Sequence, residues 1–315
     1  MATLTRETEF YDNTKLSAYK DCPRKFQLRH RLHWRSKGIS LPLTFGLAWH
    51  EAMSVVWKFY HKVPLRELPD YALAKFIETW EAQGLSSQLG VEDIERMTPR
   101  TPSVAHEMLH GYLEARKPML EQAELLADEQ PFAVPLPETE VWYVGRLDKI
   151  VRFSGQLLVL EHKTTTEYKK DGGFKTAYVE GWFSDSQVKG YQFGGALFFP
   201  GLKQVWVDSA LVHKTAHNFF RFIPVEHSAP LLQEWIEDTR EWVARIQRDI
   251  RRGYFPKNEN SCMGKFGACP FLDICRTTAE PQALTEPPPG YIKEEWTPFD
   301  VLGLEKLILN DKRSK

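Results

Sequence analysis

The sequence lacks any apolar stretch of the roughly 20 residues that a membrane-spanning helix needs. It also lacks the apolar segment of a secretory signal peptide, because its first residues are mostly polar. From these absences we expect no membrane partner. We therefore expect a cytoplasmic protein, or one of the host-cell cytoplasm if the chain is viral.

An excess of charge of one sign is also missing. The chain has 41 Lys and Arg against 42 Asp and Glu, a formal net charge of −1. A nonspecific polycation is therefore excluded, but a local basic track on a near-neutral surface is not. At 315 residues and 42% hydrophobic content, the chain can bury a sizeable core in one large or two modest domains.

Cysteine is scarce: the chain has only Cys22, Cys262, Cys269 and Cys275. A cytoplasmic chain keeps its thiols reduced, which argues against disulfide bonds. The last three follow the spacing C-x₆-C-x₅-C in a glycine-containing stretch that would make a poor apolar core. A three-plus-one set of thiolates can hold a [4Fe–4S] cluster or a tetrahedral Zn²⁺, although the paired C-x-x-C units usual for zinc are missing. Buried thiols without a ligand are the alternative.

Residues 145–165 contain the most informative pattern in the chain. Two runs of β-favouring residues flank Ser154-Gly155, which predicts a β-hairpin. The second run is apolar over residues 157–160 and then ends in Glu161, His162 and Lys163. Because side chains alternate along a strand, Glu161 and Lys163 should lie on one face. Asp148 belongs to the first run, which should form the adjacent strand.

Two carboxylates beside one ammonium make a hard-oxygen pocket that suits Mg²⁺ or Mn²⁺. Such a metal polarises a phosphoryl oxygen and lowers the pKa of a bound water, and Lys163 would position that water or neutralise phosphate charge. Asp148, Glu161 and Lys163 therefore predict phosphodiester hydrolysis. The alternative is an exposed Glu161–Lys163 pair at a strand end, with Asp148 in a turn.

A basic stretch lies near the amino terminus. Residues 20–37 carry seven Lys or Arg, among them Arg24 and Lys25, against one acid. Aromatic or imidazole rings are interleaved with them at Phe26, His30, His33 and Trp34. Cations hold phosphates and rings stack on bases, so this stretch is a candidate track for single-stranded nucleic acid. A solvated helix face is the alternative.

The remaining pattern predicts helices and strands around the hairpin. Asp12 or Asn13 is expected to cap a first helix. The other predicted elements are a mainly helical region over 69–127, a strand over 138–142, a helix over 185–199, strands over 202–212 and 219–225, and an amphipathic helix from Leu231 to Ile250.

A family resemblance rests on Gly145-Arg146-Leu147-Asp148 followed by Glu161-His162-Lys163. This order resembles the D…(D/E)-x-K core of the PD-(D/E)XK nucleases, most closely the RecB-type branch that includes CRISPR-adaptation nucleases and many phage exonucleases. The resemblance implies an α/β fold with a restriction-endonuclease-like mixed sheet flanked by helices. It also implies a metal-dependent DNA nuclease with Asp148, Glu161 and Lys163 as catalytic residues.

Two helical motifs extend the resemblance. Gly46-x-x-x-His50 stands where this branch places a metal-binding histidine, which makes His50 a metal ligand together with Asp148 and Glu161. Glu51 competes for that role, although its side chain should point elsewhere on the helix. Gln187 and Tyr191, which share a helix face, resemble the Q-x-x-x-Y motif that orients the DNA strand. His106 and His110, also four apart, fit a surface pair better than a metal site.

The cysteines resemble those of the iron–sulfur RecB-type nucleases. The stretch from Ser17 to Phe26 is similar to their amino-terminal element, and Cys-Pro-Phe-Leu-x-x-Cys is similar to their carboxyl-terminal ending. The C-x₆-C spacing departs from the commoner C-x-x-C start. The resemblance implies that Cys22, Cys262, Cys269 and Cys275 hold a [4Fe–4S] cluster, with Zn²⁺ as the alternative.

The sequence thus predicts a single PD-(D/E)XK domain over residues 1–315. It comprises a helical insertion at about 64–130, a catalytic core at about 131–226, a cluster-binding region at about 227–276 and a tail at 277–315.

The predicted function is Mg²⁺- or Mn²⁺-dependent cutting of DNA, favouring exonucleolytic action on single strands or free ends in recombination, repair or phage DNA processing. Any helicase or recombination partner would be a separate protein, and no oligomeric state is predicted. One alternative is a DNA-binding recombination or adaptation assembly factor whose nuclease fold is mainly structural. Another is a zinc-clasped nucleic-acid-binding module.

Overall fold

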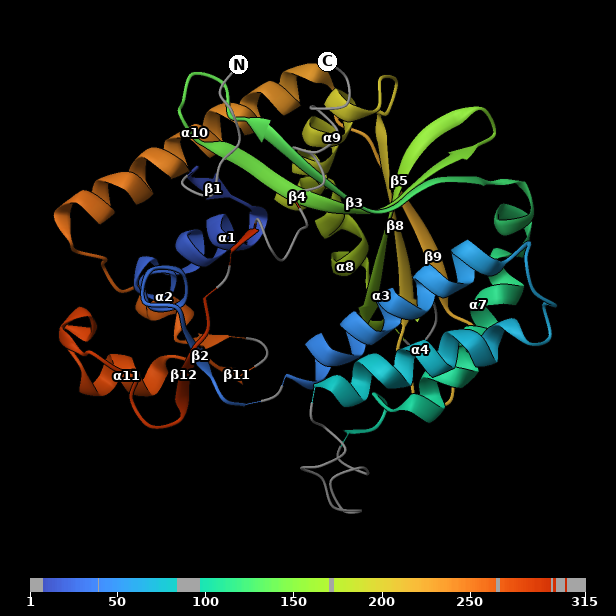
Figure 1. Ribbon diagram of the computed structural model, residues 1–315, viewed down its shortest axis with the longest axis horizontal. Coiled ribbons are helices and arrows are strands. Elements are labelled where there is room, and N and C mark those ends of the chain that lie inside the picture. The colour runs from blue at the N-terminus through green and yellow to red at the C-terminus, as the bar shows by residue number, and fades with distance from the viewer. Residues whose placement is uncertain are drawn as a thin grey trace. The chain divides into compact units, whose positions relative to one another are not determined.

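The chain forms two compact units in the computed structural model (Figure 1). Unit 1 comprises Met1–Gly38, Pro131–Gly145 and Ser228–Lys315, and unit 2 comprises Ile39–Gln130 and Arg146–His227. The structure describes residues 8–38, 40–83, 97–169, 173–264, 267–295, 297–298 and 304. Strands β3 (Glu124–Pro135) and β4 (Trp142–Phe153) each have residues in both units. The single domain over residues 1–315 stays a prediction, and parts of its insertion and tail lie outside the described residues.

Unit 2 is built on a mixed sheet. β4 and β5 (Gln156–Thr165) form the predicted antiparallel hairpin, with Lys149 opposite Leu160. The turn residues Ser154 and Gly155 have φ of 49° and 78°, the left-handed backbone that tight hairpin turns favour. β5 then pairs in parallel with β8 (Gln204–Leu211), which pairs antiparallel with β9 (Phe220–Val225). This arrangement confirms the predicted mixed sheet.

Helices cover both faces of this sheet. α3 (Leu41–Phe59), α4 (Leu68–Ala82) and α7 (Pro102–Gln122) lie together on one face (Figure 1). Their core includes Trp49, Phe76, Tyr112, Leu158 and Leu160, all almost fully buried. Because β5 side chains alternate, its odd-numbered residues face the other side, toward α8 (Thr176–Gly181) and α9 (Ser186–Phe198). The polar end of the hairpin therefore faces α9.

Unit 1 gathers the two ends of the chain. α1 (Asn13–Asp21) begins as predicted, because the Asp12 side chain accepts from the Lys15 amide at 2.7 Å. Tyr19 of α1 donates to Asp249 of α10 (Ala229–Arg252) at 2.6 Å. Other elements of this unit include α2 (Pro23–Phe26), η1 (Gln27–Arg31), α11 (Leu272–Thr277), β1 (Phe10–Tyr11), which pairs with β4, and β2 (Trp34–Ser36), which pairs with β12 (Tyr291–Lys293). None of the described helices is both long and apolar enough to cross a bilayer.

One predicted boundary and one predicted strand are wrong. The helical run expected to reach residue 127 ends at Gln122, and β3 begins at Glu124. Leu125 and Leu126 suit a strand as well as a helix, so their periodicity could not decide. The strand expected over 138–142 is instead a turn, in which Glu138 has φ of 56° and the Leu136 amide donates to the Val141 carbonyl at 3.0 Å. The strand before the hairpin is therefore β3.

Candidate active site

The end of the hairpin carries three charged side chains that the sequence places together. The Nζ atom of Lys163 lies 2.5 Å from Oε1 of Glu161. The two side chains meet because residues that are two positions apart on a strand point to the same face. Glu161 is only 1% exposed, whereas about a quarter of the Lys163 side chain reaches solvent. Asp148, on β4, immediately precedes the residues that pair with β5 and is also buried. The group therefore combines buried carboxylates with an accessible ammonium.

Asp148 is held in place from two directions. Its Oδ2 accepts from the backbone amide of His162 at 2.9 Å and lies 3.0 Å from Nδ1 of His50. His50 projects from α3, so Gly46-x-x-x-His50 does bring its histidine to the hairpin. The charge of the neighbouring Glu51 contributes, after that of Glu78, to the raised pKa of Lys75 on α4.

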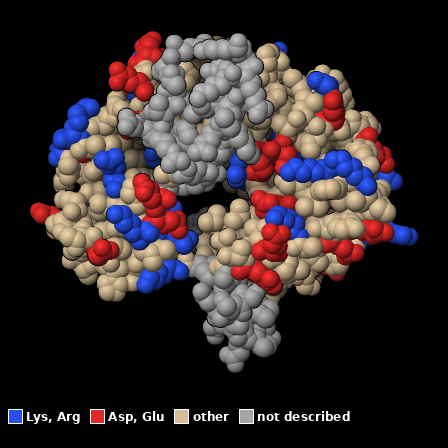
Figure 2. Space-filling model, viewed as in Figure 1, with Lys and Arg blue, Asp and Glu red and all other residues tan. Residues whose placement is uncertain are grey.

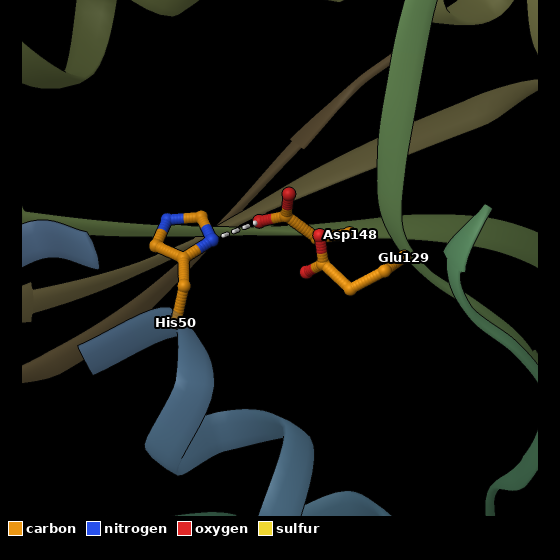
Figure 3. A group of neighbouring side chains, drawn as sticks. All are labelled: His50, Glu129 and Asp148. Atoms are coloured by element: carbon orange, nitrogen blue, oxygen red, sulfur yellow. Dashed lines mark ion pairs between the residues drawn. The ribbon is translucent and has the colours of Figure 1, made fainter. Parts of the chain in front are cut away.

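A third acidic group, Glu129 on β3, completes this arrangement (Figure 3). One ligand atom from each of His50, Glu129 and Asp148 lies within 4.8 Å of the other two. Sequence reasoning missed Glu129, because it belongs to no motif and lies at the boundary of a region expected to be helical. Its backbone is in the left-handed region, with φ of 52°, and nothing in the residue type signals this.

Burial and neighbouring charges shift the acidity of these groups. Burial and the charge of Asp148 raise the pKa of Glu161 to about 7, although Lys163 and His50 oppose them. Burial would also raise the pKa of Asp148, but His50 and Lys163 outweigh it and hold that pKa well below its usual range. The pKa of His50 is raised, because Asp148 and Glu161 outweigh the opposite effect of burial. The pKa of Lys163 is raised in the same way.

The donor set suits a divalent cation. Oε2 of Glu161 is buried and has no hydrogen-bond partner among the described residues, which is costly for a carboxylate unless something else binds it. Carboxylate oxygens with one imidazole are ligands that Mg²⁺ and Mn²⁺ accept. The residues present therefore fit such an ion.

Gln187 and Tyr191 of α9 stand beside the carboxylates. The Gln187 side-chain amide donates to Oε1 of Glu161 at 3.3 Å and to the Tyr191 hydroxyl at 2.7 Å. The shared helix face that the i, i+4 spacing predicts is therefore present. Lys163 also lies 5.9 Å from the ring centroid of Trp182, a residue that sequence reasoning did not single out.

Behind the hairpin lies a buried polar network that sequence reasoning also missed. Asp208 of β8 accepts from both Nε and Nη2 of Arg116, at 3.0 and 2.6 Å, and from the Tyr112 hydroxyl at 2.8 Å. Nδ1 of His162 lies 3.4 Å from the same carboxylate, and burial lowers the pKa of His162 to about 4. This network holds the opposite face of the strand segment that carries Glu161 and Lys163.

All four cysteines belong to unit 1. Cys22 is buried at the start of α2, and its Sγ accepts from the Asn258 amide at 3.4 Å. Burial raises the pKa of Cys269, and the nearby thiols of Cys22 and Cys262 raise it further. The pKa of Cys275 is raised by burial and by Cys22 and Cys269. The thiols are thus close enough to influence one another.

The basic residues chosen from the amino-terminal stretch differ in exposure. Arg24 is buried, and its guanidinium donates to the carbonyls of Phe255 and Ala279. Lys25 is part exposed and forms an ion pair with Asp21 at 2.6 Å. Their contact with DNA stays a prediction. Figure 2 shows Lys and Arg interleaved with Asp and Glu on the visible face, in keeping with the formal charge of −1.

His106 and His110 lie at the surface of α7, with their Nε2 atoms 3.3 Å apart. Nε2 of His106 is also 3.4 Å from the exposed Asp70.

Comparison with known proteins identifies the class of this chain. Residues 13–276 match the family model of the PD-(D/E)XK nuclease superfamily. The chain therefore belongs to the PD-(D/E)XK nuclease superfamily, whose members use divalent metals. The resemblance to its RecB-type iron–sulfur branch stays a prediction.

Two solved structures resemble the chain at low sequence identity. The crystal structure of a candidate exonuclease from Eubacterium rectale is 15% identical with a TM-score of 0.47, and the match covers 91% of this chain and 97% of that chain. The crystal structure of SSO0001 is 13% identical with a TM-score of 0.25, covering 72% and 85% respectively. No curated protein matches the chain.

Proposed function

We propose that this protein is an Mg²⁺- or Mn²⁺-dependent deoxyribonuclease whose catalytic residues are Asp148, Glu161 and Lys163. One observation carries the proposal: a chain of the PD-(D/E)XK superfamily gathers these three side chains and His50 at the end of one hairpin. The buried, unpartnered oxygen of Glu161 supports a cation at this place.

His50, Asp148 and Glu161 would hold one or two metal ions in this proposal. The bound ion supplies Lewis acidity, which polarises a phosphoryl oxygen and lowers the pKa of water. Lys163 remains a cation at neutral pH, because Glu161 and Asp148 raise its pKa. Its partly exposed Nζ would orient the attacking water or stabilise charge on the phosphate. Gln187 would fix the orientation of Glu161 through their hydrogen bond.

The proposed substrate is DNA with single-stranded or free ends, which Gln187, Tyr191 and Lys25 would help to bind. The test compares end-labelled linear single-stranded DNA with the same sequence as a closed circle, in Mn²⁺ and in Mg²⁺. An exonuclease shortens the linear strand and leaves the circle intact, whereas an endonuclease cuts both. Wild-type protein that binds the linear strand but cuts neither substrate with either metal would instead support the assembly-factor alternative.

The pH dependence of metal binding follows from the raised pKa of Glu161. In the metal-free protein Glu161 holds a proton below about pH 7, and a cation must displace that proton. We expect Mn²⁺ affinity to fall by about tenfold for each pH unit below this value and to level off above it. His50, whose pKa is also raised, steepens the dependence.

Calorimetric titration of metal-free protein with Mn²⁺ across this pH range measures the dependence. Glu161→Gln should show a weaker affinity with a shallower pH dependence, because a neutral amide is a poorer ligand and carries no proton that the cation must displace. An affinity for the wild type that does not change with pH would contradict the proposed ligand role of Glu161.

An iron–sulfur cluster held by Cys22, Cys262, Cys269 and Cys275 is the second part of the proposal. Its support is that all four thiols lie in unit 1 and that Cys22 and Cys262 influence the pKa of Cys269. Protein purified under nitrogen should be brown, with broad absorbance near about 400 nm. Cys22→Ser should lose this colour.

Metal content distinguishes the alternatives for the cysteines. Colourless protein that contains zinc would replace the cluster by a Zn²⁺ site. Colourless protein with neither iron nor zinc, after purification under nitrogen, would contradict any metal at the cysteines.

A further inference from the structure

Glu129 lies among the metal-binding candidates without belonging to any of the motifs that identified them. Figure 3 shows the carboxylates of Glu129 and Asp148 side by side, with the His50 ring facing Asp148. The ligand atoms of these three residues all lie within 4.8 Å of one another. Two oxygens that bind one Mg²⁺ at about 2.1 Å stand at most about 4.2 Å apart. Small side-chain rotations therefore suffice to place all three around one ion.

Glu161 lies outside this close group, although the motif would join it to His50 and Asp148. Among the described residues, the set that meets within 4.8 Å consists of His50, Glu129 and Asp148. Glu161 instead has Oε1 bound by Lys163 and Gln187, while its buried Oε2 has no partner. Carboxylate oxygens that could bind a cation therefore lie at two places, one beside Glu129 and one at Glu161.

We propose that Glu129 is a metal ligand of the nuclease centre, forming with His50 and Asp148 a cation position separate from the one at Glu161. The proposal rests on the metal-dependent nuclease function argued above and adds a residue to it. Glu129 and Asp148 come from neighbouring strands, and a divalent cation between them offsets the repulsion of two close carboxylates. The left-handed backbone at Glu129, with φ of 52°, is typical of a bulge that redirects a side chain.

A simple ion pair is the competing role for Glu129. Nε of Arg146 lies 2.6 Å from Oε2 of Glu129, and both side chains are part exposed. If that pair is all that Glu129 provides, removing either partner should have the same effect. If Glu129 binds a cation, removing its charge should weaken cation binding, whereas removing Arg146 should not, because Arg146 competes with the cation for the carboxylate.

The matched variants are therefore Glu129→Gln and Arg146→Met. Manganese binding is measured in metal-free protein by counting free Mn²⁺ with electron paramagnetic resonance, which reads binding without DNA or activity. Circular dichroism on each variant confirms folding. We expect the wild type to bind two Mn²⁺ ions per chain, and Glu129→Gln to lose one or to bind it at least tenfold more weakly. Arg146→Met should bind as tightly as the wild type or more tightly.

Two results would overturn the proposal. One is a folded Glu129→Gln variant whose Mn²⁺ affinity and stoichiometry equal those of the wild type. The other is an equal loss of binding in Glu129→Gln and Arg146→Met, which would assign the effect to the ion pair. In both cases the wild-type protein still binds Mn²⁺ and cuts DNA, so the proposed nuclease function would stand without Glu129 as a ligand. Wild-type protein that binds no Mn²⁺ would be a failure of the proposed function itself.

Discussion

Lys163→Ala is expected to lower the rate of DNA cleavage by about 10²- to 10³-fold, because it removes the ammonium that stabilises charge on the phosphate. Asp148→Asn should abolish cleavage more completely, since Asp148 would hold the metal and also accepts from the His162 amide and faces His50. Initial rates on end-labelled single-stranded DNA, at saturating Mn²⁺, measure both effects.

The control for these variants is Lys214→Ala. Lys214 is also a lysine of unit 2, but it is exposed in the loop between β8 and β9, so its loss should leave the rate unchanged. Mn²⁺ binding by Lys163→Ala should persist, which separates loss of catalysis from loss of the metal. A folded Lys163→Ala variant that cuts at the wild-type rate would remove Lys163 from the mechanism.

Arg116→Met is expected to destabilise the fold by about 3–5 kcal/mol, because it leaves the Asp208 carboxylate buried without its cation. Asp208 is 1% exposed, and Arg116 donates to it through two nitrogens. The guanidinium carbon also lies 3.7 Å from the centroid of the Phe222 ring, so packing is lost as well. Urea unfolding of the metal-free protein, followed by circular dichroism, measures the change.

Arg152→Met provides the matched comparison. Arg152 pairs with Glu124 at the surface, and about half of each side chain is exposed, so its loss should cost under about 1 kcal/mol. The double variant Arg116→Met with Asp208→Leu should recover part of the stability, because no buried charge remains unpaired. An Arg116→Met protein as stable as the wild type would show that Asp208 is held by other groups.

The sequence predicted the hairpin. It also predicted that Glu161 and Lys163, at the end of the hairpin, lie on one face, because strand periodicity alone requires it. It also predicted that Gln187 and Tyr191 share a helix face, which their hydrogen bond confirms. Helical spacing could not show that His50 would meet Asp148, since that contact joins distant elements. There the family resemblance supplied the expectation.

The missed residues share a physical cause. Asp208 and Arg116 lie 92 positions apart and meet only because α7 packs against the sheet. Glu129 reaches the site through a left-handed backbone conformation that no glycine or asparagine signals. In both cases the contact depends on tertiary packing rather than on local periodicity. Single-sequence reasoning therefore found the motif residues but not their supports.

The most direct test of the central claim follows one labelled single-stranded oligonucleotide through removal and return of the metal. Wild-type protein is freed of divalent ions with a chelator, mixed with the DNA, and then given Mn²⁺ or Mg²⁺ in excess. We predict no cleavage before the metal is added, prompt cleavage afterwards, and none at either stage with Asp148→Asn. Cleavage that continues in the chelator, or that Asp148→Asn carries out as fast as the wild type, would contradict a metal-dependent nuclease centred on the hairpin.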